Sequence, residues 1–380
     1  MRDSSGALDY AEISAAAVAA LDPLNADEVC AQLPAMNRRG EVSALATALR
    51  QIMPTGIQVS GLTVVECLAA MRDIGILLGS IKRHGVQPTA AVPEIEEILL
   101  ALAGRTDLVP RDTLHHYTCW NPCGTRRRMY TGDPQETHLI DAVRTAMPWL
   151  SRAITACERV TVLEPGDPDC AAGLDELGGQ LHAMVEAIDR VMAHVSPVFF
   201  ARGLRPYFEE ITVAGRSYLG PAAANMPIAL IDLALWASDR GDGSYAAFHR
   251  DTIEYSPPHW RTLYRAWRHR PSLAHVITTR LAADSDIIDP TVHASGLALC
   301  RVLRVVTVFR AKHLTVARRA YREDLRLYPV GSGGGSVELL TRILHLTRTI
   351  AAQVDHSHPA GWHTPHSAAS TTPGRASAWT

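Results

Sequence analysis

The pattern of apolar and polar positions predicts a chain built mainly of helices. Between Leu174 and Val195, apolar residues recur at alternating spacings of three and four residues, which places them on one face of a helix. The same periodicity recurs over residues 64–78, 95–102 and 139–153. Pro197 and Gly85 follow two of these segments and are residues that end helices. We therefore expect a predominantly α-helical protein.

Strand signals are confined to one short stretch. Ile211–Val213 and Ser217–Leu219 are rich in β-branched and aromatic residues and flank Ala214-Gly215. Two such runs around a glycine-containing turn predict a short hairpin.

The positions of the breaks predict two helical domains and a tail. A break near Pro110 separates a smaller N-terminal helical domain, residues 1–110, from a larger helical domain, residues 111–355. Residues 356–380 are rich in serine, threonine, proline, alanine and histidine and contain little to bury. We expect this tail to be disordered.

Composition narrows the possible partners and the compartment. The 380 residues carry a formal net charge of −2, so no global basic field is available to bind nucleic acid or an anionic membrane. The seven cysteines are scattered and odd in number, which argues against a disulfide framework and favours a reducing compartment. Charged residues interrupt the apolar runs, so we expect no membrane span. These features together predict a cytoplasmic protein.

One histidine lies at the centre of an apolar helical stripe. If residues 302–321 form a helix, a narrow sector of its surface contains Val302, Val306, Phe309, His313, Val316 and Ala320, whereas the basic residues of this segment fall outside that sector. His313 is then either a hydrogen-bonded core histidine or an axial haem ligand that points into a cavity from which water is excluded. Periodicity does not decide between the two interpretations.

A glycine-rich segment, residues 331–336, follows this helix and precedes another apolar periodic stretch. It is either a flexible linker or a loop whose backbone N–H groups approach an anion, such as a carboxylate, at a helix N-terminus. The segment lacks the Lys-Ser or Lys-Thr ending of a phosphate-binding loop.

Several stretches, in order and spacing, resemble the monodechloroaminopyrrolnitrin synthase family. They are residues 70–75, 79–85, 120–122, 130–132, 217–227, 235–236, 309–321 and 331–334, within a resemblance that runs from about residue 15 to 353. A more distant similarity to the indoleamine 2,3-dioxygenases rests on Leu204-Arg205, Pro257-Pro258 with Arg261, His313-Leu314 and the glycine loop.

The resemblance implies an all-α helical bundle of the indoleamine 2,3-dioxygenase-like type with a smaller N-terminal helical domain. It implies haem b as the cofactor, His313 as the axial ligand of its iron, and dioxygen or peroxide as the oxidant. It also implies that Arg205 pairs with the carboxylate of the substrate, a task that suits a guanidinium fork. The other substrate-binding residues that it implies are Phe200, Tyr321, Ser332, Gly333 and Gly334. No catalytic acid or base is assigned.

The function implied is haem-dependent oxidation of tryptophan or a chlorotryptophan, by oxidative decarboxylation and indole rearrangement to an aminophenylpyrrole in natural-product biosynthesis. The alternatives are a haem-dependent dioxygenase or monooxygenase acting on an indole or other aromatic amino acid, and a non-catalytic haem-binding protein. The expected partner is a small-molecule aromatic amino acid, with an external electron donor as a further candidate. One segment, Cys123–Arg128, is more basic than the family pattern, and the corresponding region of the dioxygenases approaches the distal pocket. This departure leaves the identity of the substrate open.

Overall fold

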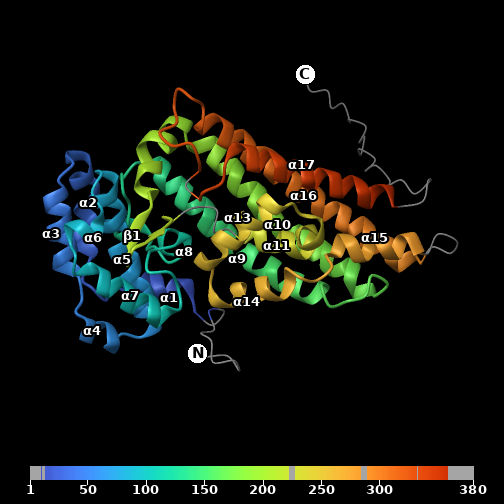
Figure 1. Cartoon of the computed structure of the whole chain (residues 1–380), viewed down its shortest axis with the longest axis horizontal. Coiled ribbons are helices and arrows are strands. Elements are labelled where there is room, and N and C mark those ends of the chain that lie inside the picture. Colours follow the sequence, from blue (N-terminus) through green and yellow to red (C-terminus); the bar gives the residue numbers. More distant parts are fainter. Residues whose placement is uncertain (1–9, 11–12, 222–226, 284–288, 332, 358–380) are drawn as a thin grey trace, which may run out of the picture.

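The computed structural model describes residues 10, 13–221, 227–283, 289–331 and 333–357. Within these ranges the chain is helical apart from one two-stranded sheet, which confirms the predicted all-α class. Figure 1 shows α2 and α3 at one end of the long axis of the molecule and α15 at the opposite end.

The N-terminal helices surround one buried helix, α5. The helices of this layer are α1 (Ala15–Ala20), α2 (Asp27–Arg39), α3 (Val42–Ile52), α4 (Gly56–Gly61), α5 (Val64–Arg83), α6 (Pro88–Ala91), α7 (Ile95–Thr106) and α8 (Leu114–Tyr117). A capping box starts α5, because Thr63 accepts a hydrogen bond from the backbone N–H of Glu66 while the Glu66 carboxylate accepts one from the N–H of Thr63. Residues 67–81 of α5 are all buried. The helix ends before Gly85, whose φ of +81° favours glycine.

Long helices form the rest of the molecule. They and the shorter helices between them are α9 (Pro134–Val160), α10 (Pro168–His194), α11 (Ile228–Asp232), α12 (Ser238–Arg240), α13 (Gly243–Thr252), α14 (Pro258–Trp267), α15 (Leu273–Ala283), α16 (Pro290–Ala320) and α17 (Val337–His356). Helix α10 packs against both α9 and α16, and α17 packs on α16. An aspartate N-cap followed by proline starts α9, α10 and α16, which is a favourable sequence for a helix N-terminus.

Irregular segments join the two parts. A π-helix, η3 (Phe199–Leu204), continues into a 3₁₀-helix, η4 (Arg205–Phe208), and then into the hairpin of β1 (Ile211–Val213) and β2 (Arg216–Tyr218). Ile211 lies opposite Tyr218, and positive φ values at Ala214 and Gly215 form the turn. The predicted hairpin is therefore confirmed. The remaining irregular helices are η2 (Gly124–Arg126), the π-helix η6 (Leu233–Ala237) and the 3₁₀-helix η7 (Ile253–Tyr255).

Two large hydrophobic clusters form the core. One contains apolar residues of α9, α10, α11 and α13–α17. The other contains those of the N-terminal helices, and it also includes Tyr130, Ile140, Tyr255 and the buried apolar residues of 204–218. The N-terminal cluster thus takes side chains from beyond residue 110, and the domain limits proposed from the sequence remain a prediction. Most of the predicted tail, residues 358–380, lies outside the described residues, and His356 belongs to α17.

By length and composition alone, α16 could cross a membrane, which the sequence analysis did not anticipate. The helix is, however, the central element of the larger cluster and packs against α10, α15 and α17. Half of its most apolar window is buried in the protein.

Close packing between α5 and the segment after α7 gives a testable consequence. A Cβ atom on Gly75 would lie 2.3 Å from the Cβ of Asp112, so alanine cannot fit without movement of the backbone. We expect Gly75→Ala to lower the free energy of unfolding by about 1–3 kcal/mol in urea denaturation. Gly104→Ala in α7 is the matched control, because its Cβ would meet no atom within 4 Å and helical alanine is favoured over glycine. Equal stability of the two variants would contradict this account.

Candidate functional site

His313 lies on α16, in the half of the helix that leads to its C-terminus. Its ring stacks on that of Phe309, with centroids 5.6 Å apart and planes at 20°. Within the described part of the chain, no hydrogen bond to this ring is found. Burial, with a smaller contribution from the charge of Arg310, lowers the pKa of His313 to about 4. The imidazole is therefore neutral near pH 7, and its ring nitrogens are available to a ligand.

The predicted orientation of α16 is confirmed only in part, because the buried residues of this stretch also include Leu303, Arg310, Leu314 and Ala317, which lie outside the predicted sector. Val302, Val306 and Ala320 of the apolar stripe are buried, and Phe309, His313 and Val316 are half-buried. The side chains of Arg301, Arg304, Arg318 and Arg319 are exposed. The stripe is thus less buried around His313 than at Val302, Val306 and Ala320.

A buried ion pair beside His313 was missed by the sequence analysis. Arg310, one helical turn before His313, pairs with Asp232 at the end of α11. Asp232 also accepts hydrogen bonds from Trp236 Nε1 at 3.0 Å and from the Tyr245 hydroxyl at 2.5 Å. Arg310 Nη1 donates to Thr347 Oγ1 of α17 at 2.6 Å. This network fixes the rotation of α16 relative to α11, α13 and α17, and with it the direction of His313.

Arg205 occupies the junction between the π-helix η3 and the 3₁₀-helix η4. Its side chain is buried, and Nε and Nη1 have no hydrogen-bond partner among the described residues. The guanidinium carbon lies 4.2 Å from the centroid of the Tyr328 ring, which holds the planar group from one face. Two buried guanidinium nitrogens without acceptors are costly unless they bind an anion, so Arg205 fits the role of a carboxylate receptor. Phe200, on the same π-helix, is half-buried and packs on the N-terminal cluster.

The segment between α16 and α17 folds back over this junction. Arg202 donates to the backbone oxygen of Asp324 at 2.6 Å and to that of Leu325 at 3.2 Å. Tyr321, the C-cap of α16, places its hydroxyl 3.6 Å from the position of a Cβ on Gly331. Figure 1 shows this orange-red segment next to the yellow-green chain around residue 200. The segment that follows the His313 helix therefore also covers Arg205.

The glycine-rich segment is a compact turn. The N–H of Gly331 donates to the oxygen of Gly335 at 2.8 Å, and the N–H of Gly334 donates to the oxygen of Gly331 at 2.9 Å. Gly333 is buried, whereas Gly334 is exposed with a φ of +79°. Ser332 lies outside the described residues. The hydroxyl of Ser336 caps α17 by accepting from the N–H of Leu339 at 3.1 Å, so this helix N-terminus is already satisfied in part by the protein.

The structure thus brings together some of the predicted site residues. Residues 321–335, which directly follow the helix of His313, contain Tyr321 and the glycine turn. Tyr328 of the same segment contacts Arg205, and Asp324 accepts a hydrogen bond from Arg202. In the part of the chain that is described, no hydrogen bond or ring contact joins Arg205 to His313. A ligand that contacts both Arg205 and His313 would have to lie between the junction of η3 with η4 and helix α16.

The basic segment 123–128 is neutralised within the protein. Arg126 Nε pairs with Asp27 at 2.7 Å, Arg127 pairs with Asp141 at 2.9 Å, and Arg128 pairs with Asp73 at 2.8 Å and with Asp27 at 2.6 Å. Arg128 and Asp73 are fully buried. These guanidinium groups anchor the segment to α2, α5 and α9 instead of offering positive charge to a substrate.

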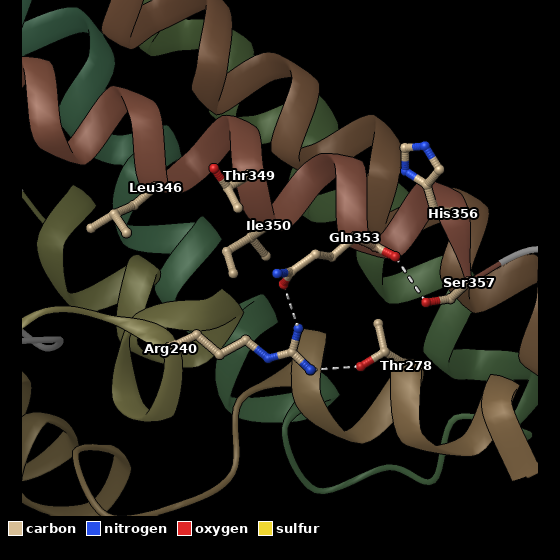
Figure 2. A pocket seen from close by; sticks show the side chains of 8 residues that line it. All are labelled: Arg240, Thr278, Leu346, Thr349, Ile350, Gln353, His356 and Ser357. Atoms are coloured by element: carbon tan, nitrogen blue, oxygen red, sulfur yellow. Dashed lines mark hydrogen bonds between the residues drawn. The ribbon is translucent and has the colours of Figure 1, made fainter.

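A surface hollow of about 730 Å³ lies elsewhere, along the C-terminal half of α17 (Figure 2). Arg240 crosses it and donates to Gln353 at 3.0 Å and to Thr278 at 2.7 Å. The Arg310 network contacts the middle of α17 through Ile343 and Thr347. Neither His313 nor Arg310 is among the residues that line the hollow.

Two other buried histidines predict how stability depends on pH. Burial lowers the pKa of His115 and of His249 to about 4, from an ordinary value of 6.5. Between pH 6.5 and 4 the unfolded chain binds these protons and the native protein does not, so acidification favours unfolding. We expect the free energy of unfolding to fall by at most about 1.4 kcal/mol per pH unit for each site in this window.

Urea denaturation between pH 7 and pH 4.5 measures this dependence. His249→Leu should show a shallower slope than the parent protein, because the His249 imidazole no longer titrates. Identical slopes for the two proteins would refute the assignment to His249.

Comparison with known families agrees with this arrangement. A model of the family described as monodechloroaminopyrrolnitrin synthase PrnB matches residues 14–359. The helical bundle and the residues assigned to the site lie within this match, and so do the stretches on which the resemblance rested. The chain belongs to the monodechloroaminopyrrolnitrin synthase family, and it is accordingly an enzyme of pyrrolnitrin biosynthesis.

Proposed function

We propose that this enzyme catalyses a haem-dependent oxidation of tryptophan or a chlorotryptophan, in which decarboxylation accompanies rearrangement of the indole to an aminophenylpyrrole. The observation that carries the proposal is the neutral, half-buried imidazole of His313, whose ring has no hydrogen-bond partner among the described residues. An axial haem ligand needs this state, because only an unprotonated nitrogen with a free lone pair binds iron.

The residues present fit a haem. His313 is held on a long core helix whose rotation the Arg310–Asp232 pair fixes. The ring of Phe309 lies against the imidazole and extends the apolar surface on which a porphyrin would rest. When bound at His313, the haem would supply an iron centre for the activation of dioxygen or peroxide.

Arg205 would bind the substrate carboxylate. Its Nε and Nη1 atoms are buried and unpartnered, and two guanidinium N–H groups can form a pair of charge-assisted bonds to one carboxylate. Tyr328 would keep the guanidinium plane in place from the side that faces the 321–335 segment. Tyr321 and the glycine turn would orient the polar end of the amino acid. Phe200 would form part of the apolar wall of the substrate site. Such fixed contacts orient the indole and exclude water.

The balance of atoms defines the reaction. Conversion of tryptophan to an aminophenylpyrrole removes carbon dioxide and two hydrogen atoms in a two-electron oxidation. The indole C2–N1 bond breaks, and the side-chain nitrogen bonds to C2. That nitrogen must attack as the neutral amine, and no oxygen atom stays in the organic product.

The test combines spectroscopy with product mass. We expect the purified protein to show a Soret band that shifts when L-tryptophan or 7-chloro-L-tryptophan is added. The product mass should be that of the amino acid less carbon dioxide and two hydrogen atoms. A gain of two oxygen atoms or of one would instead identify a dioxygenase or a monooxygenase. A Soret band with no turnover under dioxygen or peroxide would identify a haem-binding protein without catalysis, and the absence of a Soret band would refute the proposal.

A further inference from the structure

Two oxidisable aromatic side chains share one buried carboxylate in the core of the bundle. Trp236 Nε1 donates to Asp232 Oδ1 at 3.0 Å, and the Tyr245 hydroxyl donates to Asp232 Oδ2 at 2.5 Å. The two rings are nearly parallel, with centroids 5.8 Å apart and planes at 19°. Trp236 and Asp232 are fully buried, and Tyr245 is 4% exposed. The acidic hydrogen of each ring is thus already directed at the same base.

This group lies against the helix that carries His313. Arg310 pairs with Asp232, and its guanidinium carbon is 5.7 Å from the centroid of the Trp236 ring. Residues 310 and 313 are neighbours on the surface of α16, because Cβ atoms three positions apart in a helix are separated by roughly 5–6 Å. Electron transfer falls steeply with distance, so Trp236 is well placed to exchange an electron with a group bound at His313.

The surroundings of Tyr245 favour the loss of an electron and a proton together from its phenol. Burial, followed by the negative charge of Asp232, raises the pKa of Tyr245 well above its ordinary value, so the phenol stays protonated at neutral pH. Burial also raises the pKa of Asp232, which makes its carboxylate a better proton acceptor than an exposed one. In a dry site, a phenol gives up an electron readily only if its proton has a base to accept it.

We propose that Trp236 and Tyr245 form a one-electron relay to an iron porphyrin bound at His313, with Asp232 as the proton acceptor. The relay rests on the haem-dependent function proposed above. Tyr245 loses one electron through Trp236 to the porphyrin iron, which is reduced by one electron after its oxidation by peroxide. The phenol O–H bond breaks, and an O–H bond forms at Asp232 Oδ2. The product is a neutral tyrosyl radical, and an external one-electron donor reverses both transfers.

The experiment treats the ferric protein with hydrogen peroxide in the absence of substrate. Samples whose Soret band shows bound haem are frozen at successive times and examined by electron paramagnetic resonance. We expect a tyrosyl signal in the parent protein and its loss in Tyr245→Phe, which keeps the ring. Trp236→Phe should slow the appearance of the signal. The matched control is Tyr264→Phe, because Tyr264 lies in the same core, in contact with His249, but has no hydrogen bond to Asp232 among the described residues.

Isotope labelling keeps the test independent of how well the variants fold. Ring-deuterated tyrosine incorporated into the parent protein should narrow the signal. A haem-loaded protein that forms no radical, or one whose signal is unchanged by the label or by Tyr245→Phe, would overturn the relay and leave the haem-dependent function standing. A protein without a Soret band would overturn both proposals.

Discussion

Replacing His313 by alanine is expected to remove the Soret band of the purified protein and, with it, the oxidation of tryptophan. In the proposed function, the imidazole of His313 would bind the haem iron, and alanine has no atom that can replace it. The fold should persist, because the His313 ring has no hydrogen-bond partner among the described residues and its removal leaves no described polar group unpaired. Absorption spectroscopy measures the loss, and circular dichroism checks the helical content.

A matched variant separates ligand loss from general damage. His249→Ala also removes a buried imidazole whose pKa is about 4, but on α13 and outside the stripe of α16. This variant should retain the Soret band, and added imidazole should restore the band to His313→Ala by occupying the vacated space. An unchanged Soret band in His313→Ala would show that another residue binds the iron.

Replacing Arg205 by methionine is expected to lower kcat/KM for tryptophan by roughly two to three orders of magnitude. Loss of one partner from a buried, hydrogen-bonded charge pair costs about 2–5 kcal/mol, and each 1.4 kcal/mol is tenfold. The free energy of unfolding of Arg205→Met should instead rise or stay almost unchanged. The Nε and Nη1 atoms of Arg205 are buried without acceptors in the described protein, so methionine removes an unsatisfied charge and keeps much of the apolar volume. Steady-state kinetics and thermal unfolding measure the two effects.

Two controls test whether the effect of Arg205 passes through the substrate carboxylate. Tryptamine lacks this group, so its binding, followed by the Soret shift, should be nearly the same in the parent protein and in Arg205→Met. The second control is Arg202→Met, which changes an exposed arginine of the same π-helix. The described hydrogen bonds of Arg202 go to backbone oxygens in the segment between α16 and α17. An equal loss of tryptophan and tryptamine binding in Arg205→Met would place Arg205 outside the carboxylate contact.

Local sequence patterns predicted the elements that local signals mark, such as turn residues, helix breakers and apolar periodicity. The hairpin follows from a turn at Ala214-Gly215 between β-forming residues, and the predicted helix at 174–195 corresponds to α10, which ends one residue earlier at His194. The stripe of α16 was predicted because helical periodicity alone fixes which residues share a face. The helix itself begins earlier than predicted, at Pro290, since its Asp289 cap lies before the periodic segment.

The pairings that complete the site could not be predicted in this way. Arg310 looks like one more cation on a basic helix, yet it is buried because Asp232, 78 positions away, meets it in the folded protein. Arg128 likewise looks available to a ligand until Asp73 and Asp27 are placed beside it. The π-helix before Arg205 is too short for periodicity to reveal. Each of these features depends on tertiary contacts between distant segments, which a sequence pattern does not contain.

The division of the site between a rigid helix and an irregular covering segment has an evolutionary consequence. His313 is held by the buried core of α16, where the Arg310–Asp232 pair tolerates little change. Arg205, Tyr321 and the glycine turn instead belong to short helices and turns joined by contacts such as those of Arg202. Insertions and substitutions are accepted more readily in such segments than in packed helices. Under the proposed function, descendants of this scaffold can acquire new amino-acid substrates by substitutions around residues 321–335 while His313 stays in place on its core helix.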